Sequence, residues 1–135
     1  PPYWETHVAK WAGEYGEERV FVWRTNRTAA MAGAIRSFDN AIKAGELSHD
    51  GNKAHDGNKA LTAHVGNACR RVLTLKDDQG MPLWTIYKER QDSPHKIDAC
   101  VASVLAWEAR RDALAAGMGE NRKSVYEGRG VLTFG

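Results

Sequence analysis

Apolar side chains recur every three or four residues in three stretches of the chain, 4–15, 31–42 and 97–105. This spacing places each apolar set on one face of a helix, so the pattern predicts three long helices. Gly16, Gly45 and Gly117 are expected to end these helices, because glycine is typical of helix C-termini.

Polar residues and prolines indicate where these helices begin. Thr25 or Thr28 can cap the second helix. We expect the last helix to open at Ser93-Pro94, with the serine as N-cap and the proline at the first helical position. It should then run to about Ala116.

Three short β-rich runs predict strands. The run 19–23 is apolar without alternation, which is typical of a strand buried on both faces. The runs 71–75 and 83–87 flank the turn sequence 77–80 and predict a hairpin. A short helix is expected over 61–68. Strands alternating with helices indicate an α/β fold, in which a sheet is flanked by helices.

The sequence HDGNKA occurs twice in succession, at 49–54 and 55–60. The repeat is too short for a repeat architecture, so we interpret it as a local duplication that lengthens a loop. An EF-hand needs an oxygen ligand at its fifth position and glycine at its sixth, but counting from Asp50 these positions hold Ala54 and His55. His49, His55 and His64 could indicate a zinc site or a histidine-based nuclease. Their spacings match no metal-binding signature, and no cysteine pair completes a site.

Composition limits the function classes only weakly. The chain has 135 residues, 42% of them hydrophobic and 27% charged, which fits one globular domain. Its net charge of +2 gives no strong basic surface, yet a cleft that holds metals can be locally acidic. No apolar run is long enough to cross a membrane, and we expect no membrane partner. Cys69 and Cys100 lack metal-site spacing, so we expect two buried or inert thiols without a disulfide.

Asp98 is the first candidate for chemistry. It lies at the edge of the apolar stripe of the last helix, where a carboxylate could point at the ends of neighbouring strands. Phosphodiester hydrolysis by two metal ions uses such acids as oxygen ligands for Mg²⁺ or Mn²⁺. The alternative is an acid favoured by the helix dipole near a helix N-terminus, which is the commoner case.

The basic and aromatic residues have a structural and a functional interpretation. Arg70, Arg71 and Lys96 are candidates for contacts with a DNA backbone, although such residues more often lie on a solvated face. We expect Trp4 and Trp11, with Trp23, to lie in the core rather than to stack on bases.

Several segments, taken in order, resemble the nuclease domain of the large terminase subunit of tailed phages, with the actinobacteriophage type most similar. The similarity covers about 1–116. No single motif is highly specific, and the ordered set carries the resemblance. The matching segments are Pro1-Pro2-Tyr3-Trp4, Val20 to Trp23, Thr25 to Ile42, Leu47 to Asn52, Leu61 to Ala68 and Lys96-Ile97-Asp98-Ala99.

The resemblance implies a ribonuclease-H-like fold and an endonuclease that cuts concatemeric DNA with divalent metal when the phage head is full. Of the three acids of that family, only Asp98 has a counterpart here. The second would stand immediately before Pro1, so we expect a C-terminal fragment or a split-gene product that is inactive alone. The loop near the site would hold further candidates: His49, Asp50, His55, Asp56 and Asn67.

The expected organisation is a partial nuclease domain over 1–116 and a flexible tail over 117–135. The resemblance implies double-stranded DNA, the portal protein and the small terminase subunit as partners, in the cytoplasm of the bacterial host. Two alternatives stay open. One is a non-enzymatic module for docking to DNA or portal. The other is an unrelated nuclease or resolvase, in which Asp50 or Asp56 would supply a second acid.

Overall fold

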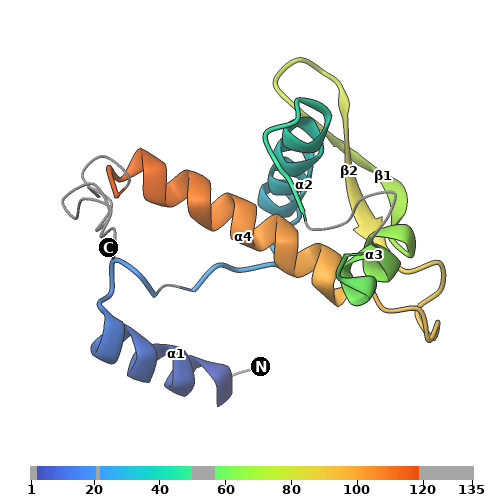
Figure 1. The fold of residues 1–135 in the computed structure, drawn as a ribbon. Coiled ribbons are helices and arrows are strands. Elements are labelled where there is room, and N and C mark those ends of the chain that lie inside the picture. The colour runs from blue at the N-terminus through green and yellow to red at the C-terminus, as the bar shows by residue number, and fades with distance from the viewer. Residues whose placement is uncertain (1–2, 21, 50–56, 119–135) are drawn as a thin grey trace, which may run out of the picture. The chain divides into compact units, whose positions relative to one another are not determined.

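The structure is a computed structural model that describes residues 3–20, 22–49 and 57–118. Helices and strands both occur within these ranges, which agrees with the mixed content expected from the sequence (Figure 1). None of the helices found there has the length and apolar character needed to cross a membrane. The elements are α1 (Tyr3–Tyr15), α2 (Thr28–Lys43), α3 (Lys59–Gly66), β1 (Cys69–Lys76), β2 (Pro82–Tyr87) and α4 (Asp98–Ala115).

The chain divides into two units, Pro1–Met31 and Ala32–Gly135. The first unit contains α1, which stops at Gly16, a glycine with a φ of 99°. The ring of His7 lies between those of Trp4 and Trp11, with centroid separations of 5.6 and 6.2 Å. Both tryptophans are exposed, so the expectation that they lie in the core is wrong.

The core of the second unit is built mainly by α2 and α4. Val104 of α4 is its most completely buried large side chain, with 1% of its surface exposed. Trp107, one turn further along α4, donates from Nε1 to Ser37 Oγ of α2 at 3.0 Å. This bond satisfies the indole N–H that burial would otherwise leave unpaired. The remaining buried apolar residues of the unit are Ala32, Ala34, Ile35, Ala41, Leu83 and Cys100.

Both helices of this core end in the same way. At the end of α2, Gly45 has a φ of 72°, its N–H donates to the Ile42 carbonyl, and the N–H of Glu46 donates to the Ala41 carbonyl. This pair of bonds is the Schellman motif, which satisfies carbonyls that the helix leaves unpaired. The end of α4 repeats it around Gly117, with a φ of 75°. The glycines that the sequence suggested as stops therefore act as expected.

The predicted hairpin is confirmed. Strands β1 and β2 pair antiparallel, with Cys69 opposite Tyr87 and Val72 opposite Trp84. The register then shifts, because Lys76 is opposite Pro82. Extra residues of β1 are accommodated there as a bulge, which is a common way for a hairpin to bend.

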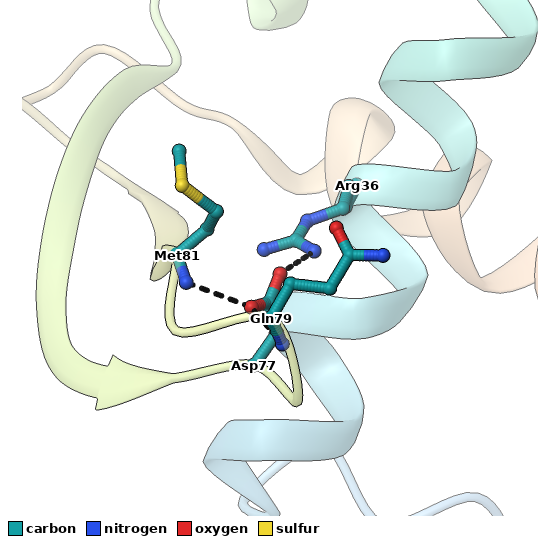
Figure 2. Close-up of polar contacts among 4 residues, drawn as sticks. All are labelled: Arg36, Asp77, Gln79 and Met81. Carbon is teal, nitrogen blue, oxygen red and sulfur yellow. Dashed lines mark hydrogen bonds and ion pairs between the residues drawn. The ribbon is translucent and has the colours of Figure 1, made fainter.

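A single side chain organises the hairpin turn. The Asp77 Oδ1 atom accepts from the backbone N–H of Gln79 at 2.9 Å and of Met81 at 2.8 Å. The Oδ2 atom accepts from Arg36 of α2 at 2.5 Å (Figure 2). The carboxylate thus holds the turn closed and ties it to a helix, which gives support to a hairpin that would be only marginally stable alone.

The strand predicted over 19–23 is wrong. Val20, Val22 and Trp23 lie outside any strand, and Val22 is 57% exposed, while Phe21 lies outside the described residues. A strand needs a neighbour to take its backbone hydrogen bonds. The two strands of the described part of the chain pair with each other, so this run has no partner there.

The predicted start of the last helix is also wrong. Helix α4 begins at Asp98, five residues after Ser93. Ser93 is buried, and its Oγ accepts from the N–H of His95 at 3.2 Å. This local turn uses the hydroxyl that the prediction assigned to a cap, a competition typical of serine.

Candidate functional site at the junction of α3 and α4

Helix α3 begins in the second copy of the duplicated sequence. Asn58 is its N-cap, and the Asn58 Oδ1 atom accepts from the N–H of Leu61 at 3.0 Å. Asparagine is among the best residues for this position, because its short side chain reaches an N–H of the first turn. The second HDGNKA copy therefore ends as the start of a helix rather than as loop.

Helix α4 begins against α3 (Figure 1). Its N-cap residue is Ile97, whose side chain makes no capping hydrogen bond. Two side chains of the α3 region bind the backbone there instead. His64 accepts at Nδ1 from the N–H of Ala99 at 2.9 Å, and Asn67 donates from Nδ2 to the carbonyl of Lys96 at 3.1 Å.

Asp98 lies between these two contacts. It is the first residue of α4 and is exposed. A carboxylate at this position is stabilised by the unpaired N–H groups and positive end of the helix dipole, so local structure is sufficient to account for an acid there. The sequence placed Asp98 at the edge of the apolar stripe of this helix. In the structure its surroundings are instead those of an exposed first residue of the helix.

The donor set among the described residues does not fit a two-metal centre. No group of three histidine, cysteine or acidic side chains that could hold a metal occurs among the residues that the structure describes. Two-metal catalysis needs several carboxylates to hold ions about 4 Å apart. Asp98 contributes one carboxylate, which is not sufficient to hold two ions at this junction.

Of the predicted site-loop residues, the structure places Asn67 at this junction, where it donates to the carbonyl of Lys96. His49 is exposed in the segment that follows α2. Asp50, His55 and Asp56 lie outside the described residues, and so does most of the expected tail, residues 119–135.

The predicted DNA-backbone contacts are divided between surfaces. Adjacent residues of a strand point to opposite faces. Arg70 accordingly stacks on Trp84, 4.6 Å from the ring centroid, and Arg71 stacks on Tyr87 at 5.0 Å. A phosphate backbone that follows one face of the hairpin would meet only one of these arginines. Lys96 is exposed at the junction, where its carbonyl is held by Asn67.

His64 is the residue whose role the sequence did not reveal. It stands out as a histidine in a short helix, and from the sequence alone it raised the questions of zinc binding and of a histidine-based nuclease. Its contact with Ala99 spans 35 residues of chain. Periodicity and short motifs do not predict a helix cap from a residue so far away in the chain. Only the folded structure shows that His64 caps α4.

The two cysteines differ in their surroundings. Both thiols are free, as expected. Cys100 is buried in α4, and burial raises the pKa of its thiol above the ordinary value of 9.0 because the thiolate is poorly solvated there. Cys69 is exposed, so of the two expected alternatives, buried or inert, burial applies to Cys100 and not to Cys69.

Comparison with models of known protein families, with curated proteins and with solved structures gives no match to this chain.

Proposed function

We propose that this chain is part of the nuclease domain of a phage large terminase subunit, a ribonuclease-H-like domain that cuts concatemeric DNA with Mg²⁺ or Mn²⁺. Asp98 supplies one of its acids, and the other acids come from outside this sequence. The chain alone is inactive, because one carboxylate does not hold two metal ions.

The meeting of two segments carries this proposal. Leu61 to Ala68 and Lys96 to Ala99 both resemble elements of that family, and they are separated by about thirty residues of chain. In the structure they touch through the His64–Ala99 and Asn67–Lys96 hydrogen bonds. A resemblance spread along the sequence thus converges on one place, and the candidate acid lies there.

Nicking of supercoiled plasmid in Mn²⁺ tests the proposal in two stages. We expect the chain alone to leave the plasmid intact. We then expect cutting once an upstream strand with its acids, taken from a phage terminase, is fused before Pro1, and loss of cutting on Asp98→Asn. The matched control is Asp112→Asn, which changes an exposed acid near the other end of α4. If the fused protein stays inactive, or if Asp98→Asn still cuts, the nuclease proposal fails.

A second candidate function is a non-enzymatic module that docks on DNA or the portal. The observation that favours it is the absence of a metal-binding group among the described residues, together with arginines displayed on both faces of the hairpin. Fluorescence anisotropy with a labelled DNA duplex separates the two functions. The docking module binds in the absence of metal, and more weakly as salt rises. Because the two arginines lie on opposite faces of the hairpin, only one of the variants Arg70→Gln and Arg71→Gln, the one on the bound face, should lower the salt slope by about one.

A further inference from the structure

We infer that His64 and Asn67 are positioning residues that set the first turn of α4, and with it the place of Asp98. That the position of Asp98 matters for catalysis rests on the proposed function. That His64 and Asn67 fix this position rests only on their contacts with the start of α4.

The start of a helix needs hydrogen-bond acceptors, because its first N–H groups have no partner within the helix. Most helices obtain one from a serine, threonine, aspartate or asparagine at the N-cap. Helix α4 has Ile97 there, and the nearby hydroxyl of Ser93 is bound to the N–H of His95. The acceptor for Ala99 is supplied by His64, from a different helix.

The two contacts bracket the candidate acid. Asn67 holds the carbonyl of Lys96, two residues before Asp98, and His64 holds the N–H of Ala99, one residue after it. The backbone on both sides of Asp98 is therefore fixed to one neighbouring element. Because the side chain of Asp98 itself is exposed, these backbone contacts are what define where its carboxylate can reach.

The bond from Ala99 also defines the chemical form of the imidazole. The Nδ1 atom accepts, so it carries no proton, and in the neutral ring the N–H is then on Nε2. A histidine that only filled space at this position could have either tautomer, whereas the capping role requires the Nε2–H form. It gives the positioning role a spectroscopic test that depends on neither metal nor DNA.

The experiment uses the full chain in NMR, without metal or DNA, at pH 8. In the native protein we expect the Nε2–H tautomer for His64 and a protected N–H at Ala99. His64→Phe keeps a ring of similar size but removes the acceptor, and the protection of Ala99 should fall about fivefold, the size expected for a lost helix cap. The Cα shift of Asp98 should move toward the coil value.

His64→Asn provides the rescue. The Oδ1 atom of asparagine and the Nδ1 atom of histidine are both two bonds from Cβ, so the new side chain offers an acceptor in the same place. Protection of Ala99 should return to within about twofold of the native value. His95→Phe is the matched control, since it makes the same chemical change at an exposed ring three residues before Asp98.

These measurements support the positioning role of His64 or contradict it. It is overturned if His64 has the Nδ1–H tautomer, if His64→Phe leaves Ala99 protected and Asp98 helical, or if His95→Phe has the same effect. Should the fused protein fail to cut DNA while these measurements hold, only the nuclease assignment is lost.

Discussion

Arg36 and Asp77 are 41 residues apart in the chain, and Nη1 of the arginine donates to Oδ2 of the aspartate at 2.5 Å. The hydrogen bond from Arg36 is the main reason why the pKa of Asp77 lies below its ordinary value of 3.8, and the N–H groups of Met81 and Gln79 lower it further. The same carboxylate serves the turn and the attachment of the turn to α2.

We expect Asp77→Asn to lower the free energy of unfolding at pH 7. The folded pKa is depressed, so the contribution of the carboxylate is full above the unfolded value of about 3.8 and is lost as the pH falls through the lower folded value. The variant and the native protein should therefore converge in urea unfolding below pH 3.8. Asp78→Asn, at the next and exposed residue, is the control and should show little change at any pH. A difference that persists unchanged at pH 2 would exclude the ionic explanation.

Two glycines near or within α2 should respond to alanine with opposite signs. Gly33 lies within the helix with open space around the position of a Cβ atom, so Gly33→Ala should stabilise by about 0.5–1 kcal/mol. Gly45 has a φ of 72°, which alanine adopts with strain, so Gly45→Ala should destabilise by about 1 kcal/mol. Urea unfolding of both variants checks this pair, and equal signs would contradict the Schellman ending of α2.

Val104→Ala should be among the most damaging conservative changes in the core. The side chain is 1% exposed, and losing two methyl groups there costs about 2–3 kcal/mol, including the cavity left behind. Val72→Ala makes the same change at a side chain that is 60% exposed, and it should alter stability by less than about 0.5 kcal/mol. Thermal unfolding of both variants measures the difference, and similar losses would show that α4 is not packed as described.

Deleting one HDGNKA copy should leave the second unit folded. Either deletion gives the same sequence, in which the remaining copy still supplies the asparagine cap before Leu61. The shorter connection between α2 and α3 lowers the entropy cost of closing the loop by about 0.5 kcal/mol. Urea unfolding should therefore show equal or slightly higher stability. A clear loss would mean that the first copy has a structural role of its own.

The two thiols should differ in alkylation. Cys69 is exposed and should react with a thiol reagent at mildly alkaline pH without denaturant. Cys100 should react slowly, because it is buried and the raised pKa of its thiol keeps the reactive thiolate scarce. Mass spectrometry of the labelled protein distinguishes the sites, with urea-unfolded protein as the control in which both react. Fast labelling of Cys100 in the folded chain would contradict the packing of α4.

The predictions that succeeded depend on neighbouring residues. The hairpin around Asp77 and Gly80 was predictable because a turn and two β-rich runs lie within twenty residues of each other. Gly45 was predictable as a helix end because positive φ favours glycine whatever the rest of the fold does.

The predictions that failed depend on distant residues. The apolar run at Val22 meets the local preferences of a strand but lacks a paired neighbour among the described residues. The true start of α4 is set by His64, which the chain brings in from another helix. In the candidate site, Asp98 and Asn67 could be named from the sequence, whereas the contacts between their segments could not.

The burial of Trp107 gives this protein an internal optical reporter. All five tryptophans lie in the described ranges, and Trp107 is the one whose side chain is buried there, with its indole N–H held by Ser37. Separation of α4 from α2 would expose that ring to water and shift its emission to longer wavelength. A chain in which Trp4, Trp11, Trp23 and Trp84 are replaced by phenylalanine would report the opening of this helix pair from a single fluorophore.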